Sequence, residues 1–465
     1  MTKKAKPVRS RRPAAAARPT EAVDNLRLPA APQPATYPIE ALVPKVRQQT
    51  PAVGQRATRP DARTHGLGQT RYIDDISFPG MLYCKIKRAG IASALIKKID
   101  TREAEAMPGV MAVITGKDIP VNSFGPSIKD QPILADTRVF HAGDGVAAVA
   151  AVTEQIALEA LDKIKVEYEP LPAIFDPLEA MKDSAPKVHP PASNIYATKV
   201  IKKGDVEKGF RESYKIFEGT YSTQMVEHVP LEPHCSIASW DANGRLTIHS
   251  TLGRITLGRT DMARTLQLPL SRIRMVATIV GGNFGGKNEI TQEPALAILS
   301  KKTGRPVKGT FTRVEEFIAT TTRHPIVMHY KTGVSKDGKI LARKVRLVLD
   351  GGAYCSWSET TLGKACILSP GPYNIENVHS EAYVVYTNKT MTGAMRGFGA
   401  PQVCFAYESQ MDEIACELGI DPLEIRLRNA FHEGSASPTG QVLHSVVVKD
   451  SLLQAAERYG WKEAR

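Results

Sequence analysis

The stretch "IVGGNFGGKNE", residues 279–289, decides the interpretation of this chain, because its glycines fit different kinds of site. From Gly281 it reads G-x-x-x-x-G-K, the spacing of a phosphate-binding P-loop. That motif continues with Ser or Thr, which places a hydroxyl on Mg²⁺, whereas this chain has Asn288. No apolar strand ends in an isolated Asp suited to holding the Mg²⁺ ion. The sequence therefore disfavours ATP or GTP hydrolysis and leaves another phosphate cradle or a tight turn.

A second glycine-rich loop, "GAMRGFGAPQ" at residues 393–402, has the same predicted context. Each loop follows a predicted strand, at 272–280 or 379–388, and precedes a predicted helix. Backbone N–H groups at the start of a helix attract anions, and glycine lets the backbone approach a ligand closely. The two loops together therefore predict a cradle that holds one large polyanionic cofactor from two sides.

The composition points to a globular, cytoplasmic protein of two or three domains. The chain has 465 residues, of which 42% are hydrophobic, and its apolar runs are too short to cross a membrane. Its six cysteines form no C-x-x-C pair, which disfavours an iron–sulfur cluster or a zinc site in this chain. Scattered thiols suit the reducing cytoplasm better than a disulfide framework does.

The net charge of +13 is concentrated at one end. Residues 1–50 contain ten Lys or Arg against three Asp or Glu, a local charge of +7. We predict that residues 1–55 form a disordered, Ala- and Pro-rich basic tail. A solvated extension or an arm that holds a partner subunit fits this composition better than a nucleic-acid-binding segment does.

Beyond the tail, predicted strands and helices alternate as in an α+β protein. Thr153 is a predicted N-cap for a helix over residues 154–164, whose apolar residues follow a helical stripe: Ile156, Leu158, Leu161 and Ile164. Residues 336–338, "KDG", predict a hairpin turn between two long strands. A segment rich in Pro and polar residues, 185–205, predicts a domain boundary.

"VGGNFGGK" together with "GAMRGFGAPQ" resembles the molybdenum-cofactor subunit of the xanthine dehydrogenase family. The likeness extends over nearly the whole chain after residue 60, through stretches such as "YIDDISFPGML", "EHVPLEPHCSIASWDANGRLTIHSTLG" and "LGIDPLEIRLRN". The resemblance implies an α+β fold: a hammerhead-like α/β domain over 56–190, followed by the first molybdopterin-binding domain over 205–465. The loops would then lie against a molybdenum cofactor.

The resemblance also assigns roles to residues of the two loops. It implies that the cofactor lies against Gly282, Asn283, Phe284, Gly285, Gly286, Ala394, Arg396 and Gly397. It implies that the substrate meets Phe398, Lys364 and Asn288. An aromatic face at Phe398 suits a flat heterocycle, although ordinary core packing is the simpler explanation for a phenylalanine. A solvated surface lysine is the corresponding simple explanation for Lys364.

Three positions depart from the purine-oxidising members of the family. Asn288 stands where a substrate-contacting Glu is common, Lys364 where an Arg orients the substrate, and Leu252 where a Gln is common. Lysine is a compact point charge that lacks the planar fork of arginine, so purine specificity becomes doubtful. Lys364 would still attract a carboxylate, which favours a nicotinate-like substrate.

The family's molybdenum subunit usually continues for a further domain of comparable size. We therefore expect a split subunit, as in nicotinate dehydrogenase, although a truncated product would also explain the length. On this expectation the general-base Glu lies on a partner chain, and no residue of this chain is a metal ligand or a catalytic acid or base.

The resemblance implies oxidative hydroxylation of an N-heteroaromatic compound, nicotinate-like or purine, with water as the oxygen source. It implies a molybdenum–molybdopterin cofactor, in its cytosine dinucleotide form for a bacterial source, shared with a second molybdopterin-binding subunit. Further subunits would carry [2Fe-2S] clusters and FAD. An aromatic acyl-CoA reductase or aldehyde oxidoreductase subunit is the alternative enzyme. A non-catalytic scaffold with a nucleic-acid-binding tail is the alternative of another class.

Overall fold

The computed structural model describes residues 56–464, so the predicted disordered tail at 1–55 lies outside the described residues. The chain divides into two units, Met1–Gln69 and Thr70–Arg465. The described part of the first unit contains one short helix, α1 (Ala62–Gly66). The second unit contains the sheets and loops that form the candidate site.

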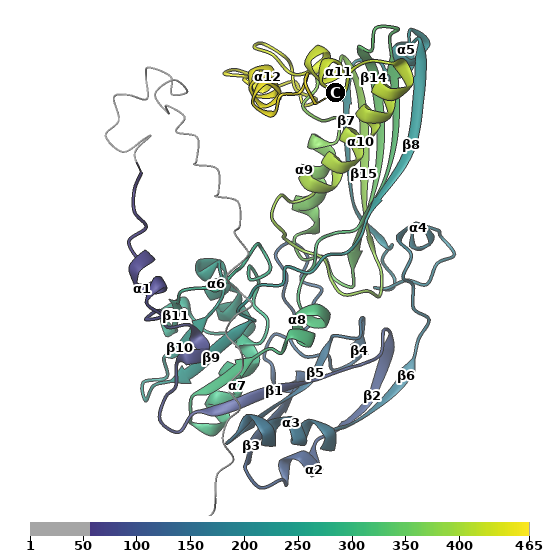
Figure 1. Ribbon diagram of the computed structural model, residues 1–465. Helices are drawn as coiled ribbons and strands as arrows, with labels where there is room; N and C mark the ends of the chain where they lie inside the picture. Colours follow the sequence, from purple (N-terminus) through teal and green to yellow (C-terminus); the bar gives the residue numbers. More distant parts are fainter. Residues whose placement is uncertain (1–55, 465) are drawn as a thin grey trace, which may run out of the picture. The chain divides into compact units, whose positions relative to one another are not determined.

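The second unit contains three β-sheets (Figure 1). The seven-stranded sheet has the order β11-β10-β9-β12-β1-β5-β3, with β1 (Leu82–Arg88), β3 (Val110–Thr115), β5 (Gly145–Ala151), β9 (Cys235–Trp240), β10 (Leu246–Ser250), β11 (Ile273–Ala277) and β12 (Val307–Thr310). The five-stranded sheet has the order β7-β15-β14-β13-β8, with β7 (Ile195–Lys203), β8 (Lys215–Thr223), β13 (Ile326–Val334), β14 (Ile340–Gly352) and β15 (Asn377–Tyr386). The small third sheet contains β4 (Arg138–Val139), β2 (Ala94–Asp100) and β6 (Lys165–Pro170).

The seven-stranded sheet joins parts of the chain that are far apart in sequence. β1 pairs in parallel with β12, where Leu82 lies opposite Val307, and pairs antiparallel with β5 on its other side. Strands from both sides of the predicted boundary at 185–205 therefore share one sheet. Its core contains buried residues from β1, β5, β9 and β10 packed against the helices α6 (Ile255–Thr265) and α7 (Glu293–Thr303).

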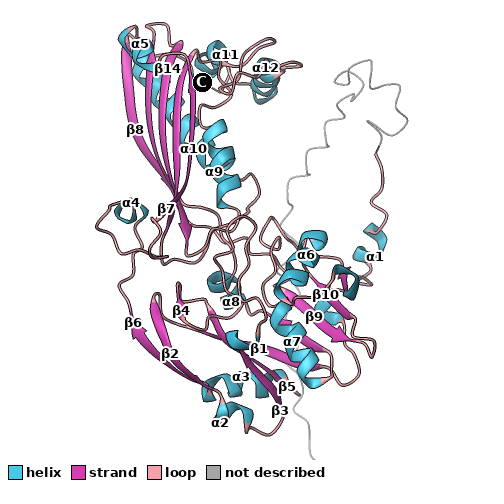
Figure 2. Cartoon of the chain, turned by 180° about the vertical axis from the view of Figure 1, so that it is seen from behind, coloured by secondary structure: helices cyan, strands magenta, loops and turns pink. Residues whose placement is uncertain are grey.

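α9 (Ser358–Leu368) and α10 (Ala400–Leu418) lie along one face of the five-stranded sheet (Figure 1 and Figure 2). Buried Leu347, Leu349 and Val403 belong to the core between these layers. Burying such a side chain stabilises the fold by about 1.5–3 kcal/mol. The remaining helices of this unit are α2 (Arg102–Glu105), α3 (Glu154–Lys163), α4 (Pro177–Ala180), α5 (Val206–Arg211), α8 (Arg313–Ala319), α11 (Pro422–Asn429) and α12 (Val448–Tyr459).

Helix α3 confirms the predicted N-cap, and of the predicted stripe only Leu158 departs from the buried face. The Thr153 hydroxyl accepts a hydrogen bond from the backbone N–H of Ile156, as expected of an N-cap. The residues of α3 that are fully buried are Ala157 and Ala160, whereas Leu158 is 40% exposed. The small side chains of Ala157 and Ala160 let the helix approach the sheet closely. Leu158 therefore lies on the outer side of the helix although it is hydrophobic.

Candidate functional site

The two glycine-rich loops lie against each other. The backbone N–H of Arg396 donates a hydrogen bond of 2.8 Å to the carbonyl oxygen of Phe284. A Cβ atom placed on Gly285 would lie 2.4 Å from the carbonyl oxygen of Ala394, far inside van der Waals contact. The first loop follows β11 of the seven-stranded sheet and the second follows β15 of the five-stranded sheet. The predicted pairing of the loops is therefore present, and it needs a glycine at position 285.

Each loop holds a phenylalanine in the left-handed backbone region. Phe284 has φ 51° and Phe398 has φ 48°, and both are followed by glycines that also have positive φ. A bulky residue in this region costs about 1–3 kcal/mol and is typical of functional sites. Phe284 is also 48% exposed, although a phenylalanine is usually buried. The loops therefore present aromatic side chains that the fold keeps in strained positions.

His228 connects both loops, a role that the sequence analysis did not assign. Its Nε2 donates a 2.8 Å hydrogen bond to the carbonyl oxygen of Ala394 in the second loop. Its ring lies against the first loop, where a Cβ on Gly286 would be 3.0 Å from the ring. Because the carbonyl can only accept, Nε2 carries the proton in this arrangement. His228 therefore positions the two loops relative to each other.

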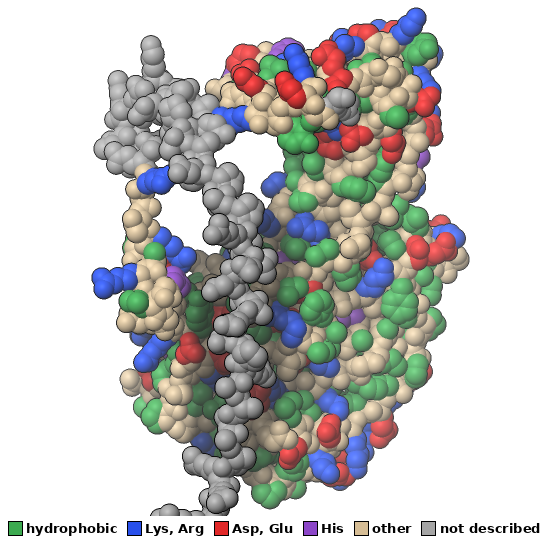
Figure 3. Space-filling view, viewed as in Figure 1, with side chains coloured by type: hydrophobic (Ala, Val, Ile, Leu, Met, Phe, Trp, Pro, Cys, Tyr) green, Lys and Arg blue, Asp and Glu red, His purple; other side chains and the backbone are tan. Residues whose placement is uncertain are grey.

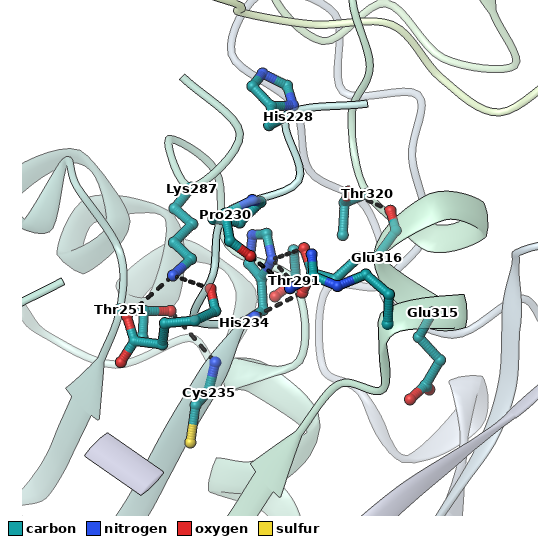
Figure 4. A network of polar contacts seen from close by, with 12 residues as sticks. His228, Pro230, His234, Cys235, Thr251, Lys287, Thr291, Glu315, Glu316 and Thr320 are labelled. Carbon is teal, nitrogen blue, oxygen red and sulfur yellow. Dashed lines mark hydrogen bonds and ion pairs between the residues drawn. The ribbon is translucent and has the colours of Figure 1, made fainter. Parts of the chain in front are cut away.

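Lys287 is buried beneath the first loop and does not point into a phosphate site. Its Nζ donates to the carbonyl oxygen of Glu232 at 2.7 Å and pairs with the Glu232 carboxylate at 3.1 Å. The same carboxylate accepts the backbone N–H of Gly281 at 2.7 Å. Figure 4 shows Lys287 pointing toward the polar network that includes His234 and Glu316. The lysine of the P-loop-like spacing is a structural residue.

The predicted helix after the first loop is present, but it starts several residues beyond the loop. α7 begins only at Glu293, and its first turn is buried. The Glu293 carboxylate accepts hydrogen bonds from the hydroxyls of Ser236 at 2.9 Å and Ser250 at 2.7 Å. The helix N-terminus is therefore occupied by protein groups. The second loop does lead directly into a helix, because Gly399 is the N-cap of α10.

A third loop, residues 353–357 between β14 and α9, contacts Glu289, the residue after Asn288. The hydroxyl of Ser356, which has φ 45°, donates a hydrogen bond to the Glu289 carboxylate. Burial raises the pKa of Glu289 to about 7, the nearby Asp261 carboxylate also raises it, and the Ser356 hydrogen bond opposes the shift. Glu289 therefore holds a proton near neutral pH at the edge of the site.

We expect Glu289→Gln to remove a pH dependence of stability. A raised folded-state pKa means that the folded chain binds this proton more tightly than the unfolded chain, so stability falls as pH rises from about 4.5 to about 7. The full effect is about 3 kcal/mol. Urea unfolding across this range should show that stability falls more steeply with pH in wild type than in the variant. Glu167→Gln, at an exposed carboxylate, is the control, and equal slopes in wild type and Glu289→Gln would contradict the assignment.

Two of the three predicted substrate residues, Lys364 and Phe398, lie close together. The Nζ atom of Lys364 lies 5.9 Å from the centre of the Phe398 ring. A Cβ on Gly399 would lie 2.7 Å from the Cβ of Ala365, so α9 packs directly on the second loop. Asn288 is half-buried in the first loop. Leu252 belongs to the hydrophobic core and offers no hydrogen bond to the site.

Comparison with known proteins assigns both parts of the chain. Residues 188–430 match the molybdopterin cofactor-binding domain, and residues 67–172 match the a/b hammerhead domain of aldehyde oxidase and xanthine dehydrogenase. The chain belongs to the aldehyde oxidase and xanthine dehydrogenase family. The predicted α+β fold class and the order of its two parts are thereby confirmed.

Members of this family match the chain over most of its length. The nicotinate dehydrogenase large molybdopterin subunit of Eubacterium barkeri is 38% identical over 87% of this chain and 96% of its own length. A probable xanthine dehydrogenase subunit of Bacillus subtilis is 40% identical over 85% of this chain and 53% of its own. The structure of aldehyde oxidoreductase from Desulfovibrio gigas superimposes with a TM-score of 0.84 at 33% identity, over 86% of this chain and 46% of that one.

The chain thus spans nearly all of one relative and about half of the other two. Two glycines of the first loop have backbone conformations that other residues rarely adopt. Gly282 and Gly285 have φ 108°, and a Cβ on Gly285 would collide with backbone atoms. The close contact at Gly285 brings the backbones of the two loops together. In residues 56–464 no group of three or more His, Cys, Asp or Glu could hold a metal ion.

Proposed function

We propose that this chain is the molybdopterin-binding half of a molybdenum hydroxylase that oxidises an N-heteroaromatic compound. The observation that carries the proposal is the contact of the two glycine loops beside Phe398 and Lys364. The Arg396–Phe284 hydrogen bond and the tight packing of Gly285 on Ala394 join the loops into one surface. Family membership supports a molybdenum cofactor as the ligand of that surface.

In this proposal the cofactor is held by Gly282, Asn283, Phe284, Gly285, Gly286, Ala394, Arg396 and Gly397. The side-chain oxygen of Asn283 already accepts the backbone N–H of Gly285 at 2.8 Å, so Asn283 acts by shaping the loop. When bound, the cofactor supplies two-electron oxidation with oxygen from water. The chain's own residues position the cofactor and the substrate, and the catalytic Glu comes from a second molybdopterin-binding subunit.

The substrate pocket of the proposal contains Phe398, Lys364 and Asn288. Phe398 offers an aromatic face for a flat ring, and the ammonium of Lys364 beside it favours a carboxylate on that ring. The similarity to a protein named nicotinate dehydrogenase fits this pocket. A purine remains the second heteroaromatic candidate, and the similarity to aldehyde oxidoreductase favours an aldehyde as the alternative.

The proposal includes a cytoplasmic complex with [2Fe-2S] and FAD subunits and the cytosine dinucleotide form of the cofactor. No helix within residues 56–464 is long and apolar enough to span a membrane. On the face seen in Figure 3, acidic and basic side chains are interspersed, whereas a nucleic-acid-binding surface concentrates basic side chains.

Metal analysis of the complex that co-purifies with the tagged chain tests the proposal. We expect molybdenum and iron in a ratio of about 1:4, since two [2Fe-2S] clusters contain four irons. Partner subunits should co-elute, and the complex should oxidise pyridine-3-carboxylate or another N-heteroaromatic. A chain that elutes alone and without molybdenum, under conditions that preserve complexes, would refute the proposal.

A further inference from the structure

Arg254 and Trp357 come from distant parts of the chain and meet next to the site. The guanidinium carbon of Arg254 lies 4.4 Å from the centre of the Trp357 ring. Arg254 directly precedes α6, and Trp357 directly precedes α9, the helix that carries Lys364. The contact is a close cation–π pair, which fixes an otherwise flexible side chain.

The residues that directly precede Arg254 and Trp357 contact the two neighbours of Asn288 in the first glycine loop. The N–H of Gly253 donates to the carbonyl oxygen of Lys287 at 2.6 Å. The hydroxyl of Ser356 donates to the carboxylate of Glu289. A Cβ on Gly253 would also lie 3.4 Å from the side-chain oxygen of Asn288. The Arg254–Trp357 pair therefore follows two segments that contact the first loop on either side of position 288.

The charge of Arg254 is not neutralised within the described part of the chain. Its side chain is exposed, and no carboxylate of residues 56–464 forms an ion pair with it. The side chain of Lys364 is also exposed and forms no ion pair with a carboxylate of residues 56–464. It lies over the ring of Phe398 as Arg254 lies over the ring of Trp357. The indole N–H of Trp357 is enclosed and also lacks a hydrogen-bond partner among these residues. Two cations on aromatic rings beside one cradle fit an anionic, flat ligand.

We propose that Arg254, held against Trp357, is a specificity-determining residue that binds the carboxylate of a heteroaromatic substrate together with Lys364. This inference rests on the proposed function and adds a second cation to its pocket. Guanidinium presents a planar fork that matches a carboxylate, which the point charge of Lys364 does not. The stacking on Trp357 reduces the conformational entropy that binding would otherwise cost. A neutral analogue gains little from either cation.

The test compares two ligands on the purified complex, pyridine-3-carboxylate and its neutral isostere pyridine-3-carboxamide. Calorimetric binding and steady-state kinetics are measured for wild type, Arg254→Gln and Trp357→Leu. For Arg254→Gln we expect Kd and KM for the carboxylate to rise about tenfold or more, with kcat less affected and the amide within about twofold. Trp357→Leu should also raise Kd and KM for the carboxylate. Arg254→Lys should retain part of the preference for the carboxylate over the amide.

A matched control is Lys301→Gln, which removes a cation that lies 5.3 Å over the ring of Trp240 in another part of the fold. It should leave the preference unchanged. Equal changes for both ligands in Arg254→Gln, no change, or a wild-type complex that does not bind the carboxylate would overturn the inference. Turnover of N-heteroaromatics without an Arg254-dependent preference overturns the inference alone. An Arg254-dependent preference without any such turnover overturns the proposed function alone.

Discussion

Replacing Gly285 by alanine should greatly lower the molybdenum content of the purified complex, while most of the chain stays folded. Gly285 has φ 108°, and its added Cβ would lie 2.4 Å from the oxygen of Ala394 and 3.1 Å from the Cα of Met395. These neighbours are backbone atoms, so no side-chain rotation relieves the collision and the loops must separate. The backbone conformation alone costs about 1–3 kcal/mol. That corresponds to a roughly five- to hundredfold loss of cofactor retention, measured as molybdenum per chain by mass spectrometry.

Gly363→Ala is the control for this experiment. Gly363 lies within α9, and an added Cβ would meet no atom within 4 Å. Alanine is also the better helix former, so this variant should keep its molybdenum and unfold at an equal or slightly higher temperature. Molybdenum within twofold of wild type in Gly285→Ala would show that the loops do not need this contact to hold the cofactor.

Lys287→Met should lower the free energy of unfolding by about 3–5 kcal/mol, because it leaves a carboxylate without its counter-charge in the interior. The side chain of Lys287 is fully buried, and that of Glu232 is 10% exposed. The variant also removes the hydrogen bond to the Glu232 carbonyl oxygen. Urea unfolding measures the loss. The P-loop interpretation predicts the opposite result. A phosphate-binding lysine is exposed, so its removal would leave the free energy of unfolding unchanged.

Two further variants separate this pair from a general effect of charge. Lys302→Met breaks a surface ion pair with Asp118 of 2.7 Å, which should cost no more than about 1 kcal/mol. Lys287→Met combined with Glu232→Gln should recover part of the loss, because the amide oxygen still accepts the N–H of Gly281 and the buried charge is gone. A double variant no more stable than Lys287→Met would argue against the buried ion pair as the cause.

Local sequence signals predicted local structure well. The "KDG" turn joins β13 and β14 as expected, with Gly338 at φ 82°, and Thr153 caps α3. The neighbours of β1 could not be predicted in this way. Leu82 and Val307 are separated by more than two hundred residues, and nothing in either strand encodes the other as its partner.

In the candidate site too, features set by local sequence were predictable, whereas contacts between distant segments were not. The glycine loops were recognisable because positive φ angles and close backbone contacts restrict these positions to glycine, and such restrictions are visible in sequence. His228, the burial of Lys287 and the Arg254–Trp357 pair were not recognised, because each depends on contacts between segments far apart in the chain. Only the assembled fold shows that Lys287 faces Glu232 and not a phosphate.

The position of β1 between β12 and β5 has a consequence for engineering chimeras of this family. A fragment cut at the apparent junction near residue 188 would retain β12 without its neighbour on one side. An open strand edge of this kind invites pairing with other copies and aggregation. Grafts between relatives should therefore transfer residues 70–386, which contain every strand of the three sheets, as one block, although this block crosses the boundary that composition marks. Recombination at that boundary would succeed only where both parents have matching β1 and β12 registers.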